Sequence, residues 1–492
     1  MNGLLPFGPF AWAFIALYLS SLLLVGYISF KARRTNTLHD FYVAGSGFGF
    51  FVLLMTLYAT QYSGNTLFGF SGATYRIGFP WILSVHSIAA IVMFLLAYAL
   101  RLHRLSKQHG FVTPVDFIAF RYSHKPLALL ASIVMIVVLC NYLLAQLMAM
   151  GRALQGLAGE SGDIAYNWGV VVLALIIVVY GTLGGLRAVA WTDLIQGTVL
   201  MLGFLLLLLL LYVQFGSIGD ATREIISRGE VAKVAPPDAS RMREWVSYVL
   251  LIGMGGALYP QAIQRVYAAG SESTLRKSMA VMAFLPFVSI FVSVLAGIYA
   301  LAYVSGLSGV SSDQALTALF REVQQHSLLG YALVVLIFSA VLAAIMSTAD
   351  SAMLSISSMF TKDIYGEYFE PAADEARLSF VGKVCSWVLI TLLVMLAILL
   401  KDKASLVSLI DRKFDLLVQL VPAFMLGVHS NYLKPKPVFL GLVFGVITAL
   451  VLAFGPFDFV DGGKIYGFHP GLYGLGLNLL ICLSGSARRR LV

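Results

Sequence analysis

Long apolar runs alternate with short polar stretches along the whole chain. We predict a membrane-spanning helix wherever about 20 mainly apolar residues follow one another. The expected helices cover residues 9–30, 48–73, 80–101, 127–157, 166–186, 189–214, 245–268, 278–305, 329–360, 380–400, 405–429, 437–455 and 468–485. The pattern therefore predicts an all-α polytopic membrane protein with about thirteen transmembrane helices.

The composition excludes an ordinary soluble domain. Of the 492 residues, 59% are hydrophobic and only 12% are charged, whereas soluble domains carry about 25% charged residues. The three cysteines, Cys140, Cys385 and Cys482, lie in apolar segments without metal-ligand spacing or a disulfide framework. The net charge of +9 could indicate a nucleic-acid partner. Lys and Arg beside spanning helices explain it more simply, so we expect no nucleic-acid partner.

The basic residues also predict an orientation in the membrane. Expected cytoplasmic loops contain basic clusters such as Lys31-Ala-Arg33-Arg34 and Arg488-Arg489-Arg490. The opposite loops at 74–79 and 158–165 contain a single basic residue, Arg76. Because Lys and Arg favour the cytoplasmic side, we predict a multi-pass protein of the plasma (inner) membrane. Its N-terminus is expected outside and its C-terminus in the cytoplasm.

The orientation fits least well at four basic residues on the expected outer side, Lys401, Lys403, Arg412 and Lys413. The eleventh predicted helix contains the charged residues Asp411, Arg412, Lys413 and Asp415. We expect them at the outer interface, where long side chains extend toward water. An outer gate is an alternative role for them.

Two predicted helices contain residues that interrupt a helix. The second contains Tyr62-Ser63-Gly64-Asn65-Thr66, and the seventh contains Gly253 to Gln261 with Pro260 near its end. Gly and Pro free backbone groups that lipid cannot satisfy, so such breaks belong beside a cavity or ligand. The second and seventh predicted helices lie five helices apart in the chain. Breaks in both predict a transporter built from two inverted five-helix repeats. The alternative is that Gly only permits close helix packing.

The ninth predicted helix carries polar residues deep in its apolar run. Ala344, Ser347, Thr348 and Ser351 lie at offsets 0, 3, 4 and 7, on one helix face, and Asp350 lies near its rim. An ionisable residue inside a membrane is costly and marks a functional-site candidate. Small residues and oxygen ligands on one face suit a hard cation such as sodium. Alternatively, the hydroxyls bond to carbonyls one turn earlier.

The chain resembles the sodium:solute symporter family over nearly its whole length. The motifs that carry the resemblance are Asp40-Phe-Tyr-Val-Ala-Gly45, Gly184-Gly-Leu-Arg-Ala-Val-Ala-Trp-Thr-Asp-Leu-Ile-Gln196, Gln264-Arg265, Ala343-Ala-Ile-Met-Ser-Thr348 and Lys362-Asp-Ile-Tyr365. The resemblance implies a LeuT-like core of inverted repeats at 48–214 and 245–429. An extra helix at 9–30 would precede the core, and two helices at 437–485 would follow it.

The family resemblance also implies cation sites. The first sodium site would use the carbonyls of Ala59, Tyr62 and Ala344 with the hydroxyls of Ser347 and Thr348. A second site, present in some members, would use Asp193, Ser347, Asp350 and Ser351. Two alternatives stay open for its carboxylates: Asp193 caps a helix together with Gln196, or Asp350 pairs with a basic residue.

The chain departs from the family pattern at two positions. Ser46-Gly47 follows the first motif where an Arg is common, which weakens only a loop contact. Gln61 stands where proline symporters carry an Asp, which argues against proline as the substrate.

The substrate is expected between the two broken helices, near the middle of the membrane. The candidate residues are Gln61, Ser63, Asn65, Tyr259, Gln261 and Gln419. Helix N-termini at the breaks favour an anionic group, so an amino acid or carboxylate is the preferred small-molecule substrate. The aromatic residues Tyr58, Tyr62, Phe68 and Trp245 could instead enclose a quaternary ammonium such as choline.

These expectations add up to a symporter that couples a small organic solute to Na⁺ by alternating access. A proton-coupled carrier is the nearest alternative, and a membrane solute sensor is a remote one. No nucleophile–base pair, metal motif or phosphate loop indicates an enzyme. We expect Na⁺ as the coupling ion and no cofactor. The lipid bilayer is expected to surround the protein, and no obligate protein partner is expected.

Overall fold

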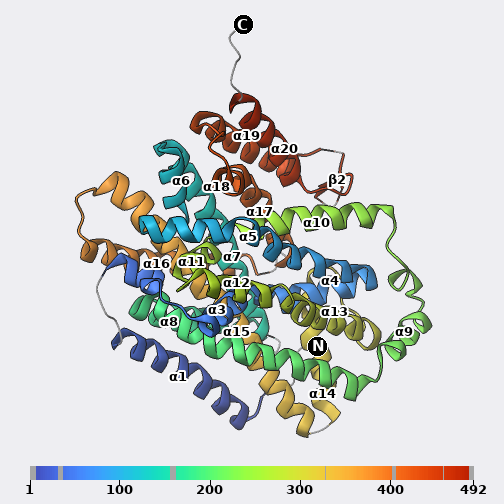
Figure 1. Cartoon of the computed structure of the whole chain (residues 1–492). Helices are drawn as coiled ribbons and strands as arrows, with labels where there is room; N and C mark the ends of the chain where they lie inside the picture. The colour runs from blue at the N-terminus through green and yellow to red at the C-terminus, as the bar shows by residue number, and fades with distance from the viewer. Residues whose placement is uncertain are drawn as a thin grey trace.

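The computed structural model describes residues 7–31, 37–155, 162–326, 328–401, 406–457, 459–461 and 463–486. This part of the chain is almost entirely helical (Figure 1). Its only sheet is the antiparallel pair β1 (Val460–Asp461) and β2 (Lys464–Ile465).

The described residues of the first half of the chain form eight α-helices. Their bounds are α1 Pro9–Lys31, α2 Leu38–Val43, α3 Phe50–Gln61, α4 Phe70–Ile77, α5 Ser84–His109, α6 Pro114–Tyr122, α7 Lys125–Gln155 and α8 Gly162–Phe215. Short 3-10 or π turns cover Ala44–Ser46, Asn65–Gly69 and Phe79–Leu83.

Twelve more helices form within the described ranges of the second half. Their bounds are α9 Ile218–Ser227, α10 Ala239–Ala257, α11 Pro260–Ala268, α12 Glu272–Met282, α13 Leu285–Tyr303, α14 Ala315–His326, α15 Leu328–Met359, α16 Glu375–Leu399, α17 Leu406–Leu417, α18 Gly427–His429, α19 Pro435–Phe454 and α20 Pro470–Ser486. Short 3-10 or π turns cover Val231–Lys233, Gly309–Gln314, Phe360–Phe369, Val418–Leu420 and Pro422–Leu426.

The apolar helices are those of a multi-pass membrane protein. Within the described residues, eight helices are long and apolar enough to span a bilayer, or nine if the bent pair α10 and α11 counts as one span. The predicted count of thirteen and the repeat boundaries stay predictions. Two predicted segments merge into the 54-residue α8, which bends at Gly185. Gly185 has φ +60°, and a Cβ there would lie 2.4 Å from the Phe41 carbonyl oxygen.

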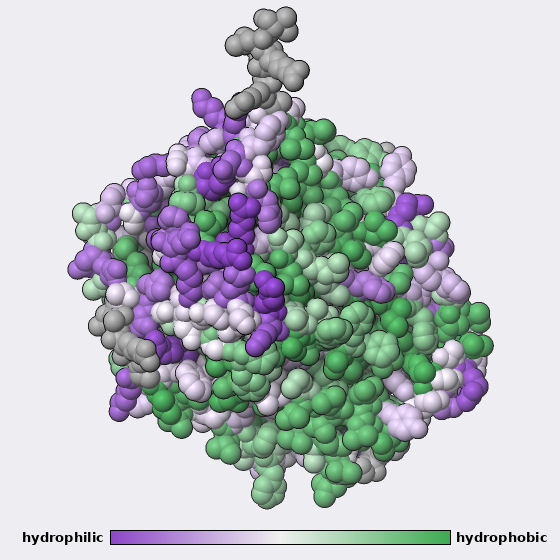
Figure 2. Space-filling model, in the orientation of Figure 1, coloured by the Kyte–Doolittle hydropathy of each residue, from purple (hydrophilic) through white to green (hydrophobic). Residues whose placement is uncertain are grey.

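Hydrophobic side chains cover most of the visible face of the molecule (Figure 2). Polar side chains gather mainly on the left, and a smaller group lies at the right edge, where Figure 1 places α9. Large apolar residues such as Phe10 and Leu17 on α1, 92% and 70% exposed, belong to the hydrophobic surface. Soluble monomers rarely expose so large an apolar surface, so this one suits contact with lipid.

Helix α15 runs through the core and packs against α8, α7 and α3. From Ile337 to Met359 every residue of α15 is buried. A helix buried on all sides belongs to the centre of a large bundle. The polar residues predicted for the cation sites therefore lie in the interior, away from lipid.

The sequence pattern predicted no helix in the loop between the eighth and ninth predicted helices, but the structure has helical segments there. The turn Gly309–Gln314 and α14 form there, and many of their residues are buried. Asp313 anchors the turn by accepting hydrogen bonds from Arg152, at 2.8 Å, and from Arg76, at 3.4 Å. These short amphipathic segments contain no run of about 20 apolar residues, so a search for spanning helices passes over them.

Candidate functional site

The break in the second predicted helix lies between α3 and α4. Helix α3 ends at Gln61, and Tyr62 is extended, with φ −100° and ψ 109°. Side chains satisfy the amides that the break leaves free: Ser63 N donates to Thr66 Oγ1 at 3.1 Å, and Gly64 N donates to Gln146 Oε1 at 3.2 Å. The break is therefore a defined structure that turns polar backbone groups toward the core.

The break meets α15 where the first sodium site was predicted. Ser347 Oγ donates to the Ala59 carbonyl at 2.9 Å, and Thr348 Oγ1 lies 3.4 Å from the same oxygen. Both hydroxyls also lie near the Ala344 carbonyl, at 3.3 and 2.9 Å. The structure thus brings four buried oxygens from two helices together. The alternative of bonding to the preceding turn also holds, because each hydroxyl contacts Ala344 as well as Ala59.

Tyr62, the fifth residue of the predicted sodium site, lies beside this cluster. Its ring packs against that of Tyr58, with 4.7 Å between the ring centroids. Its hydroxyl is buried and has no hydrogen-bond partner. The ligand predicted from Tyr62 is its carbonyl, and that role stays a prediction.

Asp193, from the predicted second cation site, forms a buried ion pair with Arg265. Arg265 Nη2 lies 3.2 Å from Asp193 Oδ2, and both side chains are fully buried. The same guanidinium donates to Ser351 Oγ at 2.5 Å and through Nε to Thr56 Oγ1 at 3.1 Å. Thr56 in turn donates to Asp193 Oδ2. Asp193 lies within α8 and not at a helix start, so it does not cap the helix.

Asp350 joins this network through a neighbouring hydroxyl. Ser351 Oγ lies 3.2 Å from Asp350 Oδ1, and the Tyr180 hydroxyl donates to Asp350 Oδ2 at 2.5 Å. Within the described residues Asp350 has no basic residue in salt-bridge distance, in contrast to the alternative considered above. Ser347 bonds in the first cluster, so the structure groups Asp193, Asp350 and Ser351 without it.

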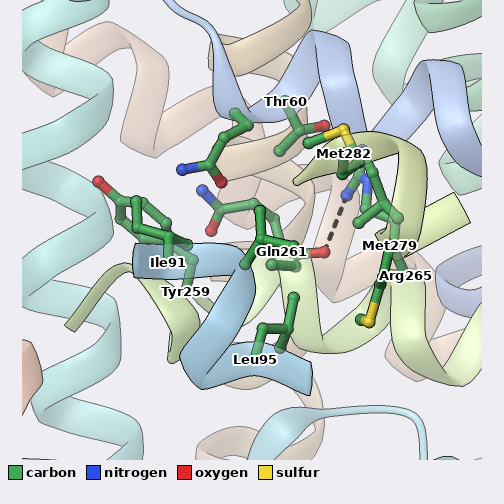
Figure 3. A pocket seen from close by; sticks show the side chains of 12 residues that line it. Thr60, Ile91, Leu95, Tyr259, Gln261, Arg265, Met279 and Met282 are labelled. Atoms are coloured by element: carbon green, nitrogen blue, oxygen red, sulfur yellow. Dashed lines mark hydrogen bonds between the residues drawn. The ribbon is translucent and has the colours of Figure 1, made fainter. Parts of the chain in front are cut away.

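A narrow pocket lies beside the two broken helices (Figure 3). Three of the predicted substrate residues, Gln61, Tyr259 and Gln261, line it. Neither amide atom of the buried Gln261 side chain has a hydrogen-bond partner among the described residues. Thr60 and Arg265 also line it, and apolar residues such as Leu95, Met279 and Met282 form the rest of the wall (Figure 3). The pocket therefore combines an apolar wall with unsatisfied amide groups, as expected of a ligand site.

The other predicted substrate residues do not line this pocket. Ser63 lies buried in the break of the α3 region. The side chain of Asn65 lies outside the described residues. Gln419 Nε2 donates to the carbonyls of Asp415, at 3.0 Å, and Gly471, at 2.8 Å, so its amide is held against α20.

Lys413 does not lie at the outer interface, as the sequence led us to expect. It is buried, with 4% exposure, and Asp415 has only 2%. The Lys413 ammonium lies over the ring of Tyr142, 3.6 Å from its centroid, and near the rings of Tyr259 and Phe414. The prediction was wrong because it relied on nearness to a helix end, whereas α17 turns this residue toward the broken α10–α11 helix.

Sequence reasoning also missed the functional neighbours Arg265, Thr56 and Tyr180. Arg265 was noted only as part of a motif. An arginine inside an apolar segment is itself a signal that a carboxylate lies nearby. Thr56 and Tyr180 carried no such signal, because hydroxyl groups are common in packed membrane helices. Within the described part of the chain, no group of three or more His, Cys, Asp and Glu side chains could hold a metal ion.

Comparisons with known proteins relate the chain to transporters. The chain is 25% identical over 462 residues to the sodium/pantothenate symporter of Haemophilus influenzae, covering 93% of this chain and 91% of the relative. It is 24% identical to the sodium/proline symporter of Escherichia coli, covering 88% of this chain and 86% of the relative. These relatives are transporters and not enzymes.

The fold is similar to that of solved sodium symporters. The structure of a Na⁺-coupled sialic acid symporter matches with a TM-score of 0.78 and 18% identity, covering 98% of each chain. The LeuT-type fold of such structures agrees with the fold expected from the broken helices. The sequence model of the sodium:solute symporter family matches residues 41–445, and the chain belongs to this family.

Proposed function

We propose that the protein imports a small organic solute together with Na⁺ by alternating access. The observation that carries the proposal is the meeting of the Ala59 carbonyl, at a helix break, with the hydroxyls of Ser347 and Thr348. Hard cations take oxygen ligands, and a broken helix provides carbonyls that a continuous helix would use internally. Family membership supports Na⁺ as the coupling ion.

Na⁺ at this position would couple to the solute through the helix break. The ion would join α3 to α15, while the residues after Ala59 lead directly to Gln61 in the pocket. Binding of either ligand would then favour the same conformations, and the coupling must be reciprocal. We propose that the solute is an amino acid or a carboxylate. We also propose that the protein has the membrane orientation predicted from its basic loops.

The carboxylates of Asp193 and Asp350 support a second cation site that includes Ser351. This buried network contains two carboxylates and one guanidinium: Arg265 pairs with Asp193, whereas Asp350 joins through Ser351. In the part of the chain that the structure describes, Asp193 Oδ1 has no hydrogen-bond partner. A second cation would balance the remaining negative charge and use this free oxygen. Ser347, which bonds to Ala59, would have to turn to contribute to both sites.

The test uses purified protein in liposomes. We expect Na⁺, compared with K⁺, to raise the thermal stability of the wild type and to drive uptake of at least one labelled solute from a panel. The double substitution Ser347→Ala with Thr348→Ala should raise the sodium concentration for half-maximal effect at least tenfold, a change of about 1.4 kcal/mol or more.

The matched control is Ser339→Ala, on the same helix. Ser339 is buried and donates only to the Val335 carbonyl, at 3.0 Å. The Ser339→Ala variant should have the same sodium dependence as the wild type. Unchanged sodium dependence in the double variant would refute the site, and uptake driven by a proton gradient without Na⁺ would refute sodium coupling.

A further inference from the structure

Lys413 lies in an aromatic cage formed by three helical regions. Its Nζ is 3.6 Å from the ring centroid of Tyr142 on α7, 5.4 Å from that of Tyr259 at the α10–α11 break, and 5.1 Å from that of Phe414 on α17. The rings of Tyr142 and Tyr259 stack nearly parallel, 5.3 Å apart. The faces of these rings are therefore directed at a cation that belongs to the protein itself.

No described carboxylate neutralises this ammonium. Asp411, two residues earlier, lies near the Tyr248 hydroxyl at 3.5 Å and His469 at 3.8 Å. Asp415, two residues later, pairs with Arg412 at 3.0 Å and accepts from Gly471 N at 2.7 Å. Within the described residues, Lys413 has no salt bridge within 4.0 Å and donates no hydrogen bond to another residue.

A buried ammonium without an anion is electrostatically incomplete. Aromatic faces attract a cation, but they do not replace the water that a charged group loses on burial. Buried charges in proteins are normally paired. An anionic ligand that enters the core would supply the missing partner.

The ammonium is adjacent to the pocket and to the sodium site. Tyr259 belongs to both the cage and the pocket wall. The hydroxyl of Tyr142 faces Ser63 and Thr348, in the region of the predicted sodium ligands. Next to Tyr259, Gln261 presents an amide with no partner on either its oxygen or its nitrogen. Lys413 thus lies one ring away from a pocket that offers a solute the unpartnered amide of Gln261. The charged residue of the pocket wall, Arg265, is already paired with Asp193.

We propose that Lys413 is the counter-ion of the substrate carboxylate, and that the transported solute is an organic anion without an ammonium group. This inference rests on the proposed function and narrows its substrate class. A quaternary ammonium would compete with Lys413 for the same ring faces. An amino acid would bring its own cation beside Lys413, and a neutral sugar would leave the ammonium unpaired.

The experiment compares solutes of different charge in liposomes that contain the full chain. The labelled panel consists of pantothenate, pyruvate and acetate as anions, pantothenol as the neutral alcohol matching pantothenate, and proline, glucose and choline. We expect sodium-driven uptake of at least one anion, and pantothenate to compete with it at least tenfold better than pantothenol. Lys413→Gln should raise the KM for the anion at least tenfold and reduce the preference of pantothenate over pantothenol to less than threefold.

Two further variants separate charge from folding. Lys413→Arg keeps the positive charge and should retain the preference for anions, even if uptake is slower. Lys436→Gln removes an exposed Lys from the start of α19 and should leave both uptake and preference unchanged. The thermal stabilisation of Lys413→Gln by Na⁺ shows whether the variant is folded and still binds the ion.

The outcomes distinguish this inference from the proposed function. Sodium-driven uptake of proline, with none of the anions transported, would uphold the proposed function and overturn the inference. Sodium-driven uptake of glucose or choline alone would also overturn the inference and would uphold only sodium coupling. Unchanged anion preference in Lys413→Gln would also overturn it. Anion uptake that needs Lys413 but not Na⁺ would uphold the inference and overturn sodium coupling. If no solute of the panel is taken up and none stabilises the protein, both are wrong.

Discussion

The ion pair between Asp193 and Arg265 joins α8 to α11 inside the bundle. Both side chains are fully buried. Removing one partner of such a pair leaves a buried charge uncompensated, at a cost of about 3–5 kcal/mol. We therefore predict that Asp193→Asn markedly lowers the melting temperature in detergent. The double substitution Asp193→Asn with Arg265→Gln should recover much of this loss, since it removes both charges.

The same variants separate a structural role of Asp193 from cation binding. If the carboxylate also binds a second cation, the double variant should be stable and yet have a weakened or less steep sodium dependence. An Asp193→Asn variant as stable as the wild type would contradict the importance of the ion pair. Melting curves recorded over a series of Na⁺ concentrations measure both effects on one sample.

At the residue scale, the sequence could predict which side chains share one face of a helix, because helix periodicity determines this. Ala344, Ser347 and Thr348 share a face of α15, and the structure brings that face to Ala59. Arg265 and Lys413 escaped prediction as site residues because their partners lie on other helices. No local pattern reports which carboxylate or ring a buried cation will meet.

At the element scale, the position of the α3 break depends on Gly64. A Cβ at this residue would lie 2.3 Å from Ile345 Cγ1 on α15. We predict that Gly64→Ala separates the break from α15, because overpacking shifts the backbone. The distance between Ala59 and Ser347 would then grow, and the sodium concentration for half-maximal stabilisation should rise about tenfold, or about 1.4 kcal/mol.

A glycine elsewhere provides the control for this prediction. Gly476 is an exposed residue of α20, and a Cβ there would meet no atom within 4 Å. Gly476→Ala should leave sodium affinity unchanged and stabilise the helix by up to about 1 kcal/mol. Equal sodium affinity in the two variants would show that close approach of α3 and α15 is not needed for the ion.

Breaks marked by Gly and Pro were predicted correctly, whereas other irregularities were not. The Tyr62 break and the 48° bend between α10 and α11 occur at the expected residues. The 3-10 turn over Val418–Leu420 gave no clear signal in an apolar run, and the π turn over Pro422–Leu426 was not predicted although it begins at a proline. Such turns arise from packing between helices, which a single sequence does not display.

At the scale of the whole molecule, alternating access requires contacts that can open on each side of the pocket. On the predicted outer side, Lys464 of the small sheet pairs with Glu244 on α10. The Lys464 ammonium also lies 5.0 Å from the ring centroid of Tyr248, which faces Asp411. These contacts tie the sheet to α10 and α17 above the pocket, so we infer that they stabilise a state closed on this side.

Lys464→Gln should therefore shift the population toward an outward-open state. Ser84 lines the small hollows between Trp81 and Tyr248, close to this tie, and is 7% exposed. In a background with Cys140, Cys385 and Cys482 replaced by Ala, Ser84→Cys should react at least threefold faster with an impermeant thiol reagent when Lys464→Gln is present. Lys277→Gln, on the exposed surface of α12, is the charge-matched control and should not change the rate. An equal rate in all three proteins would show that the sheet does not hold this side closed, and a faster reaction only from the cytoplasmic side would reverse the predicted orientation of the chain.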